Sequence, residues 1–198
     1  MTVIVGARDG DRTWIASDEK VTDDNNVNMT PFRDAPAEKW VVRGKWVIAL
    51  AGECSSIHAA EQCSGLEVAE TIEDVRDLLR AEFVDLKDLV APTTQKGGIF
   101  KDFGLSGLIA SADGLWAIDP AFDVEPLSMW VAGSGAYLAL AVMRAWQKGY
   151  MDQDIDLEDA LRIAVEVASE LAPGCGGRTA IGYIDRIGFH LLQPTLPL

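Results

Sequence analysis

Hydrophobic and polar residues alternate with different periods along the chain, and each period predicts a type of element. The stretches 2–7 and 13–17 are rich in β-branched and apolar residues. They flank Asp9-Gly10-Asp11, whose turn-forming residues predict a β-hairpin. Two further short apolar runs, at 39–42 and 46–50, predict a second pair of strands.

Longer segments have the period of an α-helix. Apolar residues recur every three or four positions through 71–90, which predicts an amphipathic helix, and a shorter helix is expected at 57–63. Two more helices are expected at 136–148 and 157–171, the second with Asp156 as its N-cap. The remaining predicted strands are 104–111, 114–118, 129–132, 178–184 and 187–192.

The order of these elements is strands, helices, strands, helices, strands, without a linker, repeat or low-complexity tract. This segregation favours a layered α+β domain over a parallel sheet with crossover helices. We therefore predict one domain over residues 1–198 with a four-layer α-β-β-α sandwich of two antiparallel sheets.

Composition narrows the classes of function. The chain has 198 residues, 48% of them hydrophobic and 24% charged, which is typical of one globular domain. Its net charge of −14 argues against binding to nucleic acid or to anionic membranes. No apolar run reaches about 18 residues, and the N-terminus lacks the pattern of a signal peptide. With 3 cysteines outside CxxC spacing and 2 histidines, we expect a reducing cytoplasm and no metal site.

The second residue offers a nucleophile. A small residue after the initiator Met normally allows Met1 to be removed, so that Thr2 would carry a hydroxyl and a free α-amine. An α-amine has an ordinary pKa of about 7.7–8.0 and accepts a proton near neutral pH. One residue would then supply both the nucleophile and its base. The alternative is that Thr2 is an ordinary strand residue, because many proteins begin with Met-Thr.

Further motifs accompany Thr2 in a fixed order. These are Asp18-Glu19-Lys20-Val21-Thr22, Lys39, Ala51-Gly52, Gly133-Ser134-Gly135 and Cys175-Gly176-Gly177. Together they span nearly the whole chain and resemble the β-type subunits of the proteasome and their bacterial homologues of the HslV type. These proteins are N-terminal-nucleophile hydrolases, and the resemblance implies the same layered sandwich.

The resemblance implies a role for each matching residue. Thr2 corresponds to the nucleophile, and Asp18 to a buried acid that orients the lysine at Lys39. A cation at Lys39 would lower the pKa of the Thr2 amine and hydroxyl. Gly52 corresponds to the glycine whose N–H binds the oxyanion, and Ser134 to a serine that hydrogen-bonds near the terminal amine.

Substrate positions follow from the same resemblance. The backbone of Thr22 would pair with an extended substrate, as an added β-strand does. The first specificity pocket falls on Val21, Leu50 and Cys54, with Val41 nearby. Because these side chains are apolar and of medium size, we expect cleavage after apolar residues. The alternative is that they are core residues.

The matching residues also have simple structural explanations. Asp18 is a possible turn acid, and Lys39 a possible solvated charge on an edge strand. Gly52 is a possible helix start, and Ser134 alone is better explained as a helix N-cap. The chain also departs from the family at two polar positions before the last Gly-Gly, where it has Ala172 and Cys175.

The resulting hypothesis is an N-terminal threonine peptidase that acts on peptides or unfolded protein without a cofactor. The resemblance implies a homo-oligomeric ring and, because no ATPase motif is present, a separate ATPase as partner. Two alternatives stay open. One is a catalytically inactive structural subunit, which Ala172, Cys175 and a retained Met1 would favour. The other is an amidase of the same fold that acts on a small amide.

Overall fold

Two antiparallel sheets of five strands each form the centre of the molecule. The computed structural model describes residues 2–19, 39–51, 57, 60–90, 106–119 and 121–192. Within the helix at 72–90, side chains are described only up to residue 83. The first sheet has the order β10 (Phe189–Leu192), β9 (Thr179–Ile184), β2 (Arg12–Asp18), β1 (Val3–Asp9), β8 (Met129–Gly133). The second has the order β3 (Trp40–Arg43), β4 (Trp46–Ala51), β5 (Ser106–Ser111), β6 (Gly114–Ile118), β7 (Val124–Leu127).

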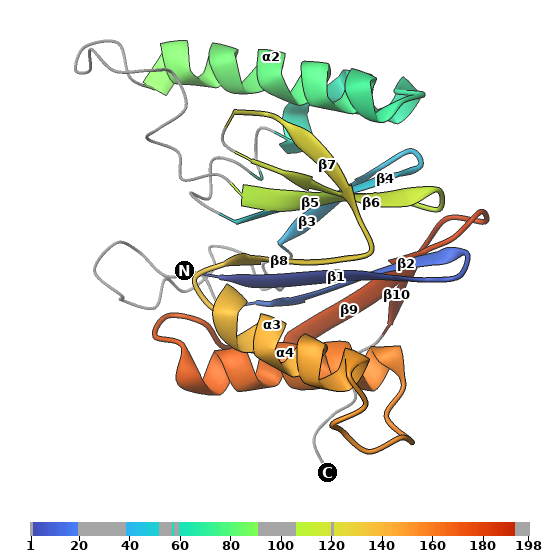
Figure 1. Ribbon diagram of the computed structural model, residues 1–198. Helices are drawn as coiled ribbons and strands as arrows, with labels where there is room; N and C mark the ends of the chain where they lie inside the picture. The colour runs from blue at the N-terminus through green and yellow to red at the C-terminus, as the bar shows by residue number, and fades with distance from the viewer. Residues whose placement is uncertain are drawn as a thin grey trace.

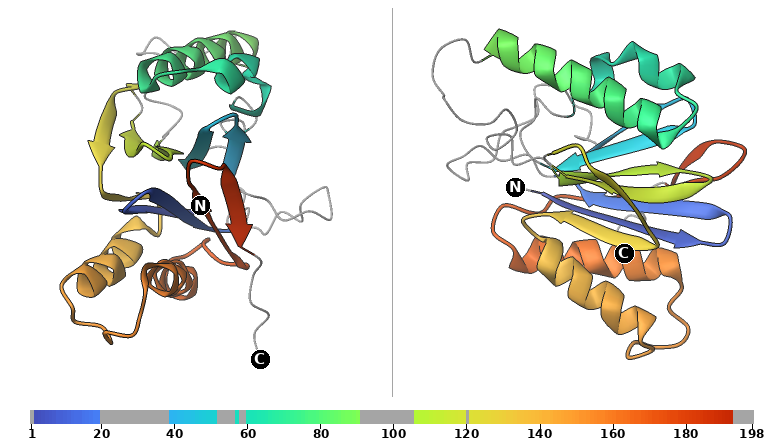
Figure 2. Two further views of the ribbon diagram at one scale, coloured as in Figure 1. Left: turned by 90° about the vertical axis from the view of Figure 1, so that its right-hand side faces the viewer. Right: turned by 45° about the horizontal axis from the view of Figure 1, so that its top comes forward.

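Helices cover the outer faces of both sheets, and Figures 1 and 2 show the resulting layers. Helices α3 (Ala136–Gln147) and α4 (Leu157–Leu171) lie against the first sheet. Helix α2 (Ile72–Val90) and the 3-10 helix η1 (Ser64–Val68) cover the second. The predicted four-layer α-β-β-α sandwich is confirmed. No helix among the described residues is long and apolar enough to cross a membrane.

Each central strand is buried on both faces, which explains its nearly continuous apolar sequence. In β1, Val3 and Val5 pack against α3 and α4, whereas Ile4 faces the second sheet. In β4, Ile48 lies beneath α2 and its neighbour Val47 points into the space between the sheets. Alternation along a strand therefore divides the apolar residues among three cores instead of between core and solvent.

One strand was not predicted. β7 pairs with β6 at the edge of the second sheet, where Pro126 lies opposite Trp116. Proline cannot donate to a ladder and is tolerated on edge strands. The segment also has two consecutive exposed residues, Glu125 and Pro126, so it lacks the alternation of apolar and polar residues that marks a strand. The other predicted elements are found within two residues of their expected ends, as far as the structure describes them.

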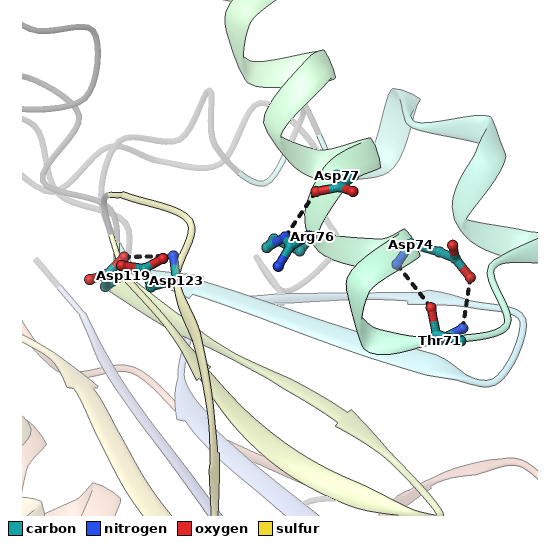
Figure 3. A network of polar contacts seen from close by, with 6 residues as sticks. All are labelled: Thr71, Asp74, Arg76, Asp77, Asp119 and Asp123. Atoms are coloured by element: carbon teal, nitrogen blue, oxygen red, sulfur yellow. Dashed lines mark hydrogen bonds and ion pairs between the residues drawn. The ribbon is translucent and has the colours of Figure 1, made fainter.

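Side chains fix the starts of two helices. At α2, the Asp74 N–H donates to Thr71 Oγ1 over 3.1 Å, and the Thr71 N–H donates to Asp74 Oδ2 over 2.9 Å (Figure 3). This is a reciprocal capping box. At α4, Asp156 accepts from the Asp159 N–H over 2.9 Å, which confirms the predicted N-cap.

Candidate active site

The β1–β2 hairpin brings Thr2 and Asp18 together. Because the two strands are antiparallel and Ile4 lies opposite Ser17, Thr2 and Asp18 lie at the same end of the hairpin. Thr2 Oγ1 donates to Asp18 Oδ1 over 2.9 Å. The two residues are only 6% and 0% exposed, so this is a buried polar pair and Asp18 is not a solvent-facing turn acid.

Backbone donors satisfy the rest of the Asp18 carboxylate. The Val3 N–H donates to Oδ1 over 2.8 Å, and the Gly176 N–H donates to Oδ2 over 3.1 Å. A buried carboxylate is costly unless it is hydrogen-bonded, and these three donors compensate it. The sequence does not reveal that the Gly176 N–H donates to Asp18, because a backbone N–H has no residue-specific signal. Its φ of 145° is the one local peculiarity of this glycine.

The Gly-Ser-Gly segment reaches Thr2 from the other side. Strand β8 pairs with β1 so that Gly133 lies opposite Val3, which places Ser134 beside Thr2. The Thr2 N–H donates to Ser134 Oγ over 3.2 Å, and Ser134 Oγ donates to the Thr2 carbonyl over 3.3 Å. The N-cap of α3 is Gly135, without a side-chain cap. Ser134 therefore binds Thr2 instead of capping the helix.

The two glycines of this segment allow its close approach to β1. Gly133 has φ 92°, and a Cβ there would collide with the Thr2 carbonyl oxygen. A Cβ on Gly135 would lie 3.0 Å from the Cβ atoms of both Val3 and Ala168. Because any side chain at either position would push β8 or α3 away, the glycines set the position of Ser134.

Cys175 and Ala172 are the two residues at which the sequence motifs depart from the proteasome-type pattern that they resemble. Cys175 is 3% exposed, and its Sγ lies 3.6 Å from Ser134 Oγ. Burial raises the pKa of the Cys175 thiol, which Ser134 partly opposes by hydrogen bonding. Ala172 is the C-cap residue of α4 and packs in the core between the helices and the first sheet. The side chain at this position is thus a methyl group in the core and offers no hydrogen-bonding group.

Lys39 and Leu50 lie at the start of β3 and near the end of β4. The Leu50 N–H donates to the Lys39 carbonyl over 3.2 Å. Lys39 is 7% exposed, so it is not a solvated edge charge. Leu50 and Val41 belong to the core cluster beneath α2 and are 2% and 6% exposed. The pairing of Lys39 with Asp18 and a role of Leu50 in substrate binding stay predictions.

Four predicted site residues, Val21, Thr22, Gly52 and Cys54, lie outside the residues that the structure describes. Thr2 contacts both Asp18 and Ser134, while Cys175 lies against Ser134 and Gly176 donates to Asp18. Within the described ranges, no group of three or more His, Cys, Asp or Glu side chains could hold a metal ion.

No protein-family model matches the sequence, and no curated protein matches it. Solved structures do. The chain resembles Thiobacillus denitrificans BPH with a TM-score of 0.74 at 20% identity, over 93% of this chain and 98% of that one. BPH in complex with epoxomicin gives the same values. Eukaryotic HslV from Trypanosoma brucei gives a TM-score of 0.65 at 20% identity, over 93% of this chain and 100% of that one. The chain therefore has the fold of the HslV-type proteasome subunits, as its sequence motifs suggest.

Proposed function

We propose that this protein is an N-terminal threonine peptidase of the proteasome type, which hydrolyses peptide bonds after removal of Met1. The observation that carries the proposal is the pair of contacts on Thr2. Its hydroxyl donates to Asp18 over 2.9 Å, and its nitrogen donates to Ser134 over 3.2 Å. Both reactive groups of an N-terminal threonine are thus held by polar partners at the end of β1, the buried Asp18 and the exposed Ser134.

Removal of Met1 would convert the Thr2 amide nitrogen into an α-amine at the same place. An amide nitrogen has no basicity, whereas an α-amine titrates near neutral pH. Ser134 Oγ, which accepts from this nitrogen and donates to the Thr2 carbonyl, would orient the lone pair of the new amine. Removal of Met1 would therefore leave the new amine within hydrogen-bonding distance of Ser134.

The proposed reaction begins when Thr2 Oγ forms a bond to the substrate carbonyl carbon and passes its proton to the Thr2 amine. The Gly52 N–H would bind the resulting oxyanion, a contact for which single donors are worth about 2.7–4 kcal/mol. The C–N bond then breaks, and the leaving amine takes the proton. Water hydrolyses the ester on Thr2 and restores its hydroxyl. A buried Lys39 beside Asp18 would keep the charge of that carboxylate compensated.

Intact mass spectrometry tests this proposal. Wild-type protein is incubated with epoxomicin, the compound found in complex with BPH. We expect a mass lighter by one methionine, followed by one adduct that maps to Thr2. The matched variant Thr2→Ala should lose Met1, keep its fold by circular dichroism, and form no adduct. Protein that keeps Met1 when made in its natural host, and forms no adduct, would instead indicate an inactive structural subunit.

A substrate panel tests the finer parts of the proposal. Short fluorogenic peptides with apolar, acidic or basic P1 residues are compared with small amides. We expect hydrolysis after apolar residues, because Val21, Leu50 and Cys54 are apolar. A preference for basic P1 residues would overturn the predicted pocket, and turnover of small amides alone would indicate an amidase.

Assembly and location complete the proposal. We infer a homo-oligomeric ring in the cytoplasm, served by a separate ATPase that delivers unfolded protein. The fold shared with HslV-type subunits supports this inference. Light scattering of the purified chain should give a mass several times that of the 21.4 kDa monomer. A monomer at micromolar concentration would contradict it.

A further inference from the structure

We propose that Cys175 is a positioning residue of this site, whose thiol donates a hydrogen bond to Ser134 Oγ and so fixes the hydroxyl that holds the Thr2 nitrogen. Only the catalytic consequence of this proposal rests on the proposed function. The hydrogen bond itself is a property of the fold and can be tested on a protein without activity.

The hydrogen-bond capacity of Ser134 gives the direction of this contact. A serine hydroxyl has one proton to donate and two lone pairs to accept. Ser134 Oγ accepts from the Thr2 N–H over 3.2 Å, and lies 3.3 Å from the Thr2 carbonyl oxygen, which can only accept. A carbonyl is a much better acceptor than a thiol sulfur, so the hydroxyl proton goes to Thr2. One lone pair is left, and the Cys175 sulfur 3.6 Å away is placed to fill it with its S–H.

The surroundings of Cys175 keep the thiol protonated and therefore able to donate. The residue is 3% exposed and belongs to the core cluster of α3, α4 and the first sheet. Burial is the main cause that raises the pKa of the thiol; hydrogen bonding with Ser134 opposes this shift in part, and the nearby negative charge of Asp18 adds to it. Because only a thiolate is a strong nucleophile, these surroundings also argue against Cys175 as an attacking group.

The backbone around Cys175 leaves the sulfur little freedom. The Cys175 N–H donates to the Ala172 carbonyl over 3.2 Å, and the next residue, Gly176, donates to Asp18 over 3.1 Å. On the opposite side, a Cβ on Gly135 would lie 3.1 Å from the sulfur. The same short segment thus holds both Ser134, through its thiol, and Asp18, through a backbone N–H.

Raman spectroscopy of the S–H stretching band tests the hydrogen bond directly. The difference spectrum between wild type and Cys175→Ser isolates the band of Cys175 from those of Cys54 and Cys63. The stretching band of an S–H group that donates a hydrogen bond lies at lower frequency than that of a free S–H group. We expect the Cys175 band to move to higher frequency in Ser134→Ala, while the bands of the other two thiols stay in place. A Cys175 band that does not respond to Ser134→Ala would overturn the proposal.

Kinetics test the catalytic consequence. We expect Cys175→Ala to lower kcat about three- to tenfold at unchanged KM, as the loss of one hydrogen bond predicts. Cys175→Ser, which keeps a donor, should stay within about twofold of wild type. Cys63→Ala is the matched control, since Cys63 is buried in the other helix-covered core. Equal losses in the Ala and Ser variants would reduce Cys175 to a packing residue.

The two measurements fail separately. If wild-type protein has no peptidase activity but the Raman band shifts as expected, the proposed function fails and the hydrogen bond stands. If activity is present and the band does not shift, the proposed function stands and the role of Cys175 is wrong.

Discussion

The two ends of the β1–β2 hairpin are built from similar residues and lie in opposite environments. At the turn, Asp9, Asp11 and Arg12 are exposed. At the other end, Thr2 and Asp18 are 6% and 0% exposed and joined by a hydrogen bond of 2.9 Å. One pair of strands therefore carries a solvated aspartate at one end and a buried one at the other.

The difference shows what a buried polar cluster requires. Asp9 needs no protein partner because water solvates it, whereas Asp18 has three donors from two distant segments of the chain. These segments are residues 2–3 at the start of β1 and the loop after α4. Such convergence is costly to assemble, and it occurs where the fold places the proposed nucleophile. The same kind of substitution made at the two ends of the hairpin should therefore change stability by different amounts.

The largest effect is expected for the buried aspartate. Asp18→Asn removes the charge and replaces one carboxylate oxygen by an NH₂ group, so that an N–H or O–H donor facing it loses its acceptor. We expect peptidase kcat to fall about 100-fold or more and the free energy of unfolding to fall by about 2–3 kcal/mol. Steady-state kinetics and urea denaturation measure the two losses.

Asp9→Asn is the matched control at the exposed end of the same hairpin. Surface substitutions of this kind change stability by no more than about 0.5 kcal/mol. The comparison fails if the two variants lose stability equally, because burial of Asp18 would then have no energetic consequence.

A pair of glycines sharpens the comparison with a smaller effect. Gly10 in the turn and Gly133 beside Thr2 both have positive φ, 59° and 92°. A Cβ on Gly10 meets nothing within 4 Å, whereas one on Gly133 collides with the Thr2 carbonyl. We expect Gly10→Ala to cost about 1 kcal/mol from backbone strain, and Gly133→Ala about 2 kcal/mol more. Thermal and urea unfolding of both variants give the difference.

Equal destabilisation by the two substitutions would mean that β8 shifts away from Thr2 at little cost. In that case the Gly-Ser-Gly segment would not fix the position of Ser134. The contact between Ser134 and Thr2 would then need another source of rigidity.

The sequence predicts most of this fold because its strands are short apolar runs and its helices have clear periods. β7 escapes prediction, since Pro126 and Glu125 interrupt the alternation of a strand that only its edge position permits. Helix α4, by contrast, has its predicted bounds, because Asp156 caps a strongly amphipathic segment.

The candidate site is predictable only in part. Thr2, Asp18 and Ser134 are visible in the sequence as side chains with chemistry. The donors that satisfy Asp18 are not, because the N–H groups of Val3 and Gly176 have no residue-specific signal. The position of Ser134 likewise depends on β-sheet register, which brings residue 134 to residue 2 across 132 positions. Long-range pairing of this kind is fixed by the whole fold and not by a local pattern.

The smallest expected effect concerns the two buried thiols. Burial raises the pKa of Cys175 near Thr2 and of Cys63 in the core beneath α2. The folded state then binds these protons more tightly than the unfolded state, in which a thiol has its ordinary pKa of about 8.5. The stabilisation is complete below that pH and is lost as the pH rises through the folded-state pKa values.

Urea denaturation between about pH 8 and 10.5 should show the free energy of unfolding falling by less than about 1.4 kcal/mol per pH unit for each thiol. Cys175→Ser and Cys63→Ala should each flatten that slope. If Cys175→Ser leaves the slope unchanged, the thiol at the Thr2 end is solvated in the folded state, and the contrast between the two ends of the hairpin is weaker than the buried contacts indicate.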